Sequence, residues 1–176
     1  MADFQNSLIA GFEERFCKRP DHVFFSPGRV NLIGEHIDYN GGKVMPCAIS
    51  LGTYLAISKN TEKIFRFHCL NFPETAELHL QQSYSKSGKA WFNYPLGVIN
   101  SFLMQGHPIS GLDMLFYGNL PIGAGLSSSA SIEVLTGFAL SELFQLKVPS
   151  IEIAVLSKKV ENEFIGVNCG IMDQFA

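Results

Sequence analysis

Apolar side chains recur every four residues near the start of the chain, at Leu8, Phe12 and Phe16. This spacing places side chains on one face of an α-helix. Pro20 follows, and proline stops a helix because it lacks a backbone N–H and fixes φ. The pattern therefore predicts an amphipathic first helix that ends before Pro20.

Alternation of apolar and polar residues then replaces the helical spacing. In KIFRFHCL, Phe65, Phe67 and Cys69 alternate with Arg66 and His68, which is typical of a half-buried strand. We predict further strands at 22–25, from about residue 51 to 58, at 78–80 and at 112–117. The segment SYSKSGK, residues 83–89, has the composition of a turn or loop.

Helical periodicity returns in the second half of the chain. Residues 91–105 form a predicted helix, with Pro95 best placed in its first turn. A second helix follows residue 131, and a third runs from Ser150 to about Gly166. Because strands crowd the first half and helices the second, we predict an α+β domain of a sheet layer and a helix layer. The final residues, GIMDQFA, show no closing element, and we expect loss of a C-terminal part.

Composition and charge exclude several classes of protein. The chain has 176 residues, of which 47% are hydrophobic and 16% charged, so it can build a core and is not disordered. A net charge of −3 offers no basic surface for nucleic acid. The N-terminus does not resemble a signal peptide, and no apolar stretch approaches the roughly 18 residues of a membrane span. A soluble, cytoplasmic protein is expected.

Residues 26–42, SPGRVNLIGEHIDYNGG, combine turn residues with many donors and acceptors. Glu35 and Asp38 can accept from sugar hydroxyls, and neutral His36 can both donate and accept. Arg29 can neutralise a phosphate. The segment is therefore either a site for a polyhydroxylated or charged molecule, or a polar loop with a local Arg–carboxylate bridge. His36 and Asp38 alone make only a weak metal signal.

Residues 121–131, PIGAGLSSSAS, form a second loop with candidate chemistry. Gly123 and Gly125 allow close backbone approach, and the serines lie at the start of a predicted helix, where free amides favour an anion. The loop is not a Walker A motif, because no GxxxxGK[ST] is present. It is either a phosphate site or a glycine-serine turn with a serine cap.

These two strings and the late CGIMDQF together resemble the GHMP small-molecule kinases, and within them the galactokinases. GRVNLIGEHIDYNGG matches the galactokinase signature, and the order and separation of the three motifs also fit. The resemblance runs from about residue 20 to the end. It implies that residues 1–176 are a GHMP kinase N-terminal domain, with a sugar loop at 26–42, a phosphate loop at 121–131 and a catalytic segment at 169–175. Galactokinases continue into a second domain that this chain lacks.

The resemblance also implies a role for each matching residue. Glu35, His36 and Asp38 would hold the hydroxyls of galactose, and Asp173 would be the general base, with Arg29 beside it and beside the transferring phosphoryl group. The ATP phosphates would be held by Gly123, Gly125, Ser127 and Ser128. Ser129 and Glu161 would coordinate Mg2+, and Trp91 and Tyr94 would lie near adenine. Without the resemblance, Glu161 reads as a solvated helix carboxylate, and Asp173 as a cap or loop carboxylate.

Three alternatives stay open from the sequence. One is a kinase for a galactose derivative such as N-acetylgalactosamine. Another is a galactose-binding sensor on the same fold, although retention of Arg29, Ser129, Glu161 and Asp173 favours an enzyme. The third is that this chain is an incomplete N-terminal fragment that is inactive alone and self-associates through an exposed interdomain surface.

Overall fold

The computed structural model describes residues 2–34, 37–121 and 125–176. Within these residues, the strands form one mixed sheet in the order β1-β2-β5-β3-β4. The strands are β1 (His22–Asn31), β2 (Pro46–Lys59), β3 (Ile64–Cys69), β4 (Ala76–His79) and β5 (Leu112–Gly118). Paired strands are antiparallel, except that β3 runs parallel to β5.

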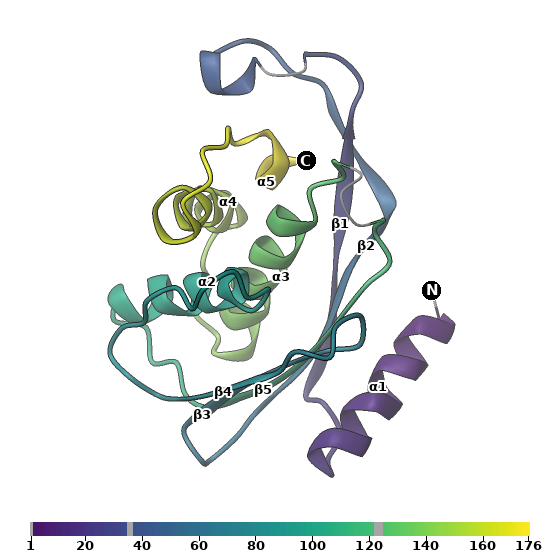
Figure 1. Ribbon diagram of the computed structural model, residues 1–176, viewed down its shortest axis with the longest axis vertical. Coiled ribbons are helices and arrows are strands. Elements are labelled where there is room, and N and C mark those ends of the chain that lie inside the picture. The colour runs from purple at the N-terminus through teal and green to yellow at the C-terminus, as the bar shows by residue number, and fades with distance from the viewer. Residues whose placement is uncertain (1, 35–36, 122–124) are drawn as a thin grey trace.

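The helices lie on both faces of this sheet. They are α1 (Ala2–Phe16), α2 (Asn93–Met104), α3 (Ser128–Leu143), α4 (Ser150–Lys159) and α5 (Met172–Phe175). A 3-10 turn, η1 (Asp38–Asn40), follows β1, and a π-helical segment, η2 (Val160–Ile165), continues α4. The helices α2 to α5 lie on one side of the sheet and α1 on the other (Figure 1). The predicted α+β arrangement of sheet and helix layers is confirmed, and α1 adds cover on the second face.

Two apolar clusters hold these layers together. The main one lies between the sheet and α2, α3 and α4, and includes the fully buried Phe65, Phe67 and Phe116. The smaller one joins Leu8 and Phe12 of α1 to Tyr54, Ala56 and Leu115 of the sheet. The apolar face that the spacing at the start of the chain predicts therefore packs against the face of the sheet opposite to α2, α3 and α4.

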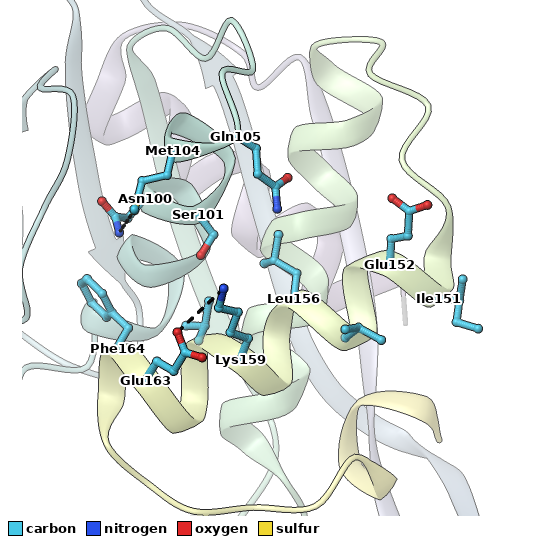
Figure 2. Close-up of a pocket in the computed structure, with 12 residues that line it drawn as sticks. Asn100, Ser101, Met104, Gln105, Ile151, Glu152, Leu156, Lys159, Glu163 and Phe164 are labelled. Atoms are coloured by element: carbon cyan, nitrogen blue, oxygen red, sulfur yellow. Dashed lines mark hydrogen bonds and ion pairs between the residues drawn. The ribbon is translucent and has the colours of Figure 1, made fainter.

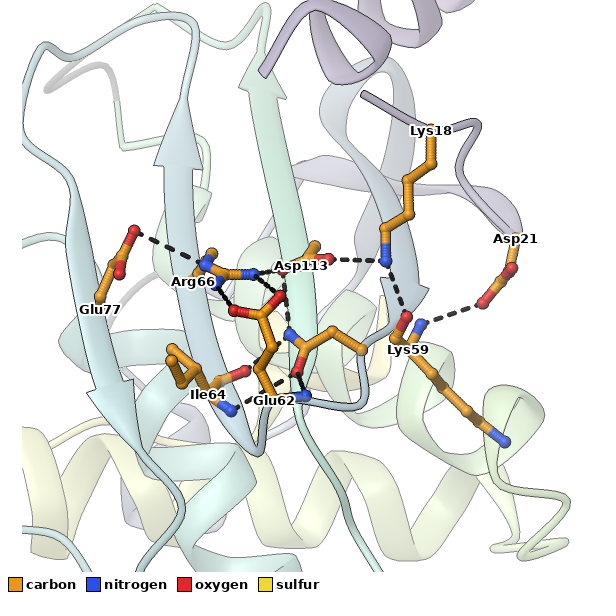
Figure 3. Close-up of polar contacts among 9 residues, drawn as sticks. Lys18, Asp21, Lys59, Glu62, Ile64, Arg66, Glu77 and Asp113 are labelled. Atoms are coloured by element: carbon orange, nitrogen blue, oxygen red, sulfur yellow. Dashed lines mark hydrogen bonds and ion pairs between the residues drawn. The ribbon is translucent and has the colours of Figure 1, made fainter. Parts of the chain in front are cut away.

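A buried carboxylate fastens the turn after α1 to the sheet. Asp113 of β5 is 2% exposed, and it accepts from Lys18 at 2.7 Å and from Arg66 at 3.0 Å (Figure 3). Asn60 donates to the same carboxylate at 3.0 Å. Burying a charge costs free energy unless it is paired, so this network offsets the cost of burying the Asp113 carboxylate in the sheet.

Three sequence-based boundaries are corrected by the structure. β1 continues to Asn31 instead of ending at residue 25, and β2 begins at Pro46, before residue 51. The two strands pair with each other along both extensions, and such long-range pairing overrides local turn preference. The third correction is α5, since the final segment contains a short helix where no closing element was predicted.

None of the helices in the described part of the chain combines the length and apolar character that a membrane span requires.

Candidate functional site

A bulge in β1 positions Arg29. The register of the β1–β2 pair shifts between Pro27 and Arg29. At Gly28, between them, an added Cβ would lie 2.7 Å from the carbonyl oxygen of Leu126 in the phosphate loop. The amide of Arg29 donates to that same oxygen at 3.3 Å. Glycine is thus needed where β1 and the phosphate loop meet, and their contact brings Arg29 to the loop.

Asp173 is held from two sides. Arg29 donates to its Oδ1 through Nε at 2.8 Å and Nη2 at 2.6 Å, and Ser127 donates to its Oδ2 at 2.6 Å. The Arg29 side chain is 11% exposed and the Asp173 side chain 25%. Charge-assisted bonds of this kind are short and directional, so the carboxylate has one orientation and still reaches solvent. Arg29 and Asp173 therefore lie together, as the resemblance implied.

Ser127 adopts a backbone conformation that is uncommon outside glycine. Its φ is 56° and its ψ is 47°, in the left-handed region, immediately before α3. Such strain costs free energy and persists where the surroundings fix it, often at functional sites. Here the hydroxyl donates to Asp173, so the strained residue ties the phosphate loop to the catalytic segment.

Glu161 is buried, contrary to its reading as a solvated helix carboxylate. It is 6% exposed, and Ser129 donates to its Oε1 at 2.7 Å. Gln174 donates to its Oε2 at 2.9 Å, and the thiol of Cys169 lies 3.4 Å from the same oxygen. Burial, with the nearby charge of Glu161, raises the pKa of Cys169 to about 12. The π-helical turn η2 places the carboxylate toward α3 and α5.

The Ser129–Glu161 pair fits a magnesium ion. A hydroxyl and a carboxylate are hard oxygen ligands, and they meet beside the N-terminus of α3, which favours phosphate. Among the described residues, no three His, Cys, Asp or Glu side chains gather into a metal cage. Magnesium does not need one, since it commonly takes one or two protein oxygens and completes its shell from phosphate and water.

Glu133 is a buried acid that sequence reasoning missed. It is 0% exposed, and in the described part of the chain neither carboxyl oxygen has a hydrogen-bond partner. Burial raises its pKa to about 10, and the charge of Glu161 adds to the rise. The available signal was a glutamate inside the apolar run of the helix after the phosphate loop. Gln174 was also missed, because nothing in its local sequence shows that Glu161 lies beside it.

Two adjoining hollows lie beside the serines of the phosphate loop. One, of about 260 Å³, is lined by Arg29, Pro121, Gly125, Leu126, Ser127, Ser128, Ser129 and Asp173. The other, of about 200 Å³, is mainly apolar and includes Phe72, Trp91, Tyr94, Phe116 and Ile132 in its lining. Ser128 and Ser129 line both hollows. One ligand could therefore place an anionic group in the first hollow and an aromatic group in the second.

The aromatic hollow is built from the end of β3 and the residues after it, from the start of α2, and from the end of β5. The indole N–H of Trp91 donates to the carbonyl of Glu74 at 3.0 Å, and its ring meets Phe116 edge-on at 5.5 Å. Burial raises the pKa of Tyr94, and the charges of Glu161 and Glu133 act in the same direction. The two contacts of Trp91 fix its indole ring in a lining that also includes Tyr94 and two serines of the phosphate loop.

A larger hollow lies elsewhere, between α2 and α4. Its volume is about 730 Å³, and Met104, Ile151, Leu156 and Phe164 are among its lining residues (Figure 2). No residue that the sequence assigned to the site lines it. Convergent polar groups mark a site better than volume does, so the two smaller hollows are the stronger candidates.

The sugar loop reaches the catalytic segment through Asp38. The amide of Met172 donates to Asp38 Oδ2 at 3.4 Å, and a Cβ added at Gly170 would overlap that oxygen at 1.6 Å. Gly170 therefore allows Asp38 to approach within contact of the segment that carries Asp173. Glu35, His36 and Gly123 lie outside the described residues.

Comparisons with known proteins agree with these motifs. The model for the galactokinase galactose-binding signature matches residues 10–59, and the model for the GHMP kinase N-terminal domain matches residues 93–176. A galactokinase of Clostridium beijerinckii is 51% identical over 97% of this chain, and one of Fusobacterium nucleatum is 53% identical over 97%. The chain spans 45% of the length of each of these relatives.

A solved structure extends the likeness to the fold. The crystal structure of Lactococcus lactis galactokinase complexed with galactose superposes with a TM-score of 0.92 at 43% identity. The match covers 98% of this chain and 46% of that one. The chain therefore has the fold of the GHMP kinase N-terminal domain and carries the galactokinase galactose-binding signature.

Proposed function

We propose that this chain is the N-terminal domain of a galactokinase, which transfers the terminal phosphoryl group of ATP to the anomeric hydroxyl of galactose. The galactose-binding signature, the relatives named galactokinase and the structure complexed with galactose support this substrate. The observation that carries the proposal is Asp173, held by Arg29 and Ser127 at the edge of the hollow lined by the phosphate-loop serines.

In this reaction Asp173 accepts the proton of the anomeric hydroxyl. The sugar oxygen then forms a bond to phosphorus as the bond between that phosphorus and the ADP oxygen breaks. Arg29 stabilises the charge on the transferring group and orients the carboxylate. Phosphoryl transfer depends mainly on positioning and charge neutralisation, and the two short bonds to Asp173 supply the positioning.

The phosphate loop and the aromatic hollow would hold ATP. Gly123, Gly125 and Ser128 would hold the phosphates, and Trp91 and Tyr94 would lie near adenine. The hydroxyl of Ser127 is already bonded to Asp173, so we assign its contribution to phosphate binding to the backbone. Ser129 and Glu161 would hold Mg2+, which neutralises phosphate charge when bound.

The sugar loop would hold galactose through Glu35, His36 and Asp38. Carboxylates accept from neighbouring hydroxyls, and the place of Asp38 against Gly170 and Met172 puts one acceptor beside the catalytic segment. Retention of Arg29, Ser129, Glu161 and Asp173 favours a catalyst over a galactose sensor.

Product analysis on the full-length enzyme tests this proposal. The enzyme is incubated with ATP, Mg2+ and either galactose or N-acetylgalactosamine, and phosphorus NMR follows the products. We expect galactose 1-phosphate with equimolar ADP, and a lower kcat/KM for N-acetylgalactosamine. Preference for N-acetylgalactosamine would reassign the substrate, and galactose binding without ADP release would indicate a sensor.

A further inference from the structure

Gln174 connects the two functional carboxylates of the site. It follows Asp173 on α5, it is 6% exposed, and its Nε2 donates to Glu161 Oε2 at 2.9 Å. Consecutive residues in a helix point about 100° apart. Asp173 therefore reaches Arg29 and Ser127 while Gln174, one residue later, reaches Glu161.

These contacts close a ring. Ser127 donates to Asp173 at 2.6 Å, and Ser129, two residues along at the start of α3, donates to Glu161 at 2.7 Å. The peptide unit between Asp173 and Gln174, together with the bond from Gln174 to Glu161, completes the circuit. Because each link is a short hydrogen bond or a covalent segment, Asp173 and Glu161 cannot shift independently.

The other supports of this junction are weak. α5 has only four residues, and its cap residue, Ile171, makes no side-chain capping bond. The thiol of Cys169 also approaches Glu161 Oε2, but a thiol is a weak donor. In the described part of the chain, Gln174 Oε1 has no partner, although it is buried. Burying an amide whose oxygen has no hydrogen-bond partner costs free energy, and an apolar side chain would fill the same space without that cost. The bond from Gln174 to Glu161 therefore calls for an explanation.

We propose that Gln174 is a positioning residue for phosphoryl transfer, which fixes Glu161 for the cation and couples Glu161 to Asp173. This inference rests on the proposed function. Removal of its amide leaves Oε2 of Glu161 with only the thiol, so the carboxylate should turn and bind the cation less well. Asp173 should also lose one of the constraints on its segment.

The test compares Gln174→Met with Met172→Leu in the full-length enzyme. Methionine matches glutamine in length and suits a buried site, but it has no N–H donor. Met172 is buried on the same four-residue helix, so its substitution by leucine controls for repacking there. The readouts are the affinity for a non-hydrolysable ATP analogue with and without Mg2+, the KM values for Mg2+ and galactose, and the melting temperature.

For Gln174→Met we expect the Mg2+-dependent gain in nucleotide affinity to fall about tenfold, as for loss of one charge-assisted bond. The KM for Mg2+ should rise by a similar factor, and added Mg2+ should restore part of the rate. Affinity without Mg2+ and the KM for galactose should change less than about twofold.

Two results would overturn the inference. One is a Gln174→Met enzyme whose Mg2+ dependence equals that of Met172→Leu. The other is a lower melting temperature with all constants worsened equally, which would make Gln174 purely structural. If Gln174→Met does not fold, Gln174→Asn serves, because its shorter amide cannot reach Glu161 and should show the same Mg2+-specific loss. Failure of the wild-type enzyme to use galactose would instead contradict the proposed function, and the nucleotide titration would still test Gln174.

Discussion

Asp38 is the one acidic residue of the sugar loop whose contacts the structure describes. Its carboxylate lies against the backbone of Gly170 and Met172, so the proposed sugar acceptor contacts the segment that carries Asp173. The same carboxylate thus serves two proposed purposes, contact with galactose and support of the catalytic segment.

We predict that Asp38→Ala weakens galactose binding selectively. A buried hydroxyl that loses its acceptor costs about 1–3 kcal/mol, so the KM for galactose should rise about 5- to 150-fold. The KM for ATP should change little, because the phosphate loop is untouched. Steady-state kinetics check this, with Glu142→Ala, an exposed carboxylate of α3, as control. An unchanged KM for galactose would remove Asp38 from the sugar site.

Glu133 allows a prediction about pH. Its pKa is raised from 4.5 to about 10 in the folded chain, chiefly by burial. Between those pH values the unfolded chain releases a proton that the folded chain keeps, so this group lowers the free energy of unfolding as pH rises. The slope from one group is at most about 1.4 kcal/mol per pH unit.

Glu133→Gln should remove this component. The variant should gain free energy of unfolding relative to the unmodified chain as pH rises from about 5 to about 9. Urea denaturation at several pH values in that range measures the difference. Glu142→Gln, at an exposed position of the same helix, should show a nearly constant difference. A constant difference for Glu133→Gln as well would show that its carboxyl titrates normally.

Contacts between distant residues were predictable only where the residues belong to motifs of a known family. The resemblance brought Arg29 and Asp173 together, and the structure places them in direct contact. It did not identify Gln174 or Glu133, because their importance depends on neighbours in η2 and α5 that local patterns do not reveal. Ser127 was expected to bind phosphate. Its hydrogen bond to Asp173 accompanies a left-handed φ, which the sequence around a serine does not predict.

At the scale of elements, the β1 bulge is the feature that joins sheet and phosphate loop. The sequence placed a loop here because Pro27 and Gly28 favour turns. In the structure, pairing with β2 continues on both sides of these residues, and the local preference appears as a bulge. The existence of the strand was therefore predictable, while the length of β1 depended on its pairing with β2, from Ser26 with Thr53 to Asn31 with Pro46.

We predict that Gly28→Ala displaces the phosphate loop. The added methyl would lie 2.7 Å from the Leu126 carbonyl oxygen and 2.6 Å from Leu120 Cδ2. Overpacking of this kind typically costs about 1–3 kcal/mol of stability, and the KM for ATP should also rise. Chemical denaturation and kinetics measure the two effects. Gly11→Ala is the matched control, since its new methyl would meet no atom closer than 3.4 Å. Equal behaviour of the two variants would show that the loop does not need this approach.

At the scale of the molecule, the β1–β2 pair extends beyond the rest of the sheet (Figure 1). Apolar side chains are exposed near its end. Leu32 is 62% exposed, Ile33 69% and Met45 58%, and backbone bonds join Leu32 and Ile33 to Met45. Contiguous exposed apolar surface of this kind favours association. We expect the remainder of the full-length enzyme to cover it.

The 176-residue chain should therefore self-associate when produced alone. Light scattering coupled to size exclusion would show a mass above that of one chain, increasing with concentration. The double variant Leu32→Ser, Ile33→Ser should shift the mass toward the monomer, whereas Ile151→Ser, an exposed apolar position on α4, should not. A monomeric unmodified chain at high concentration would contradict this expectation.

The chain alone should also lack kinase activity. Arg29, Asp173 and the phosphate loop are present, but transfer needs reacting atoms held about 3–3.5 Å apart in a site that excludes water. The Asp173 side chain is 25% exposed in this domain, and contact with water weakens its polar contacts to ligands. A coupled ADP-release assay with galactose, ATP and Mg2+ tests this. Turnover of roughly 1–10³ per second would show that these residues suffice.

The central claim is that Asp173 is the base for phosphoryl transfer, and its most direct test is the turnover of Asp173→Asn in the full-length enzyme. Asparagine keeps the shape and can still accept from Arg29, but it cannot take the hydroxyl proton. The account predicts a fall in kcat of about 10²–10⁴-fold, with the KM values for galactose and ATP nearly unchanged. A kcat equal to that of the unmodified enzyme would contradict it and leave Asp173 with a structural role only.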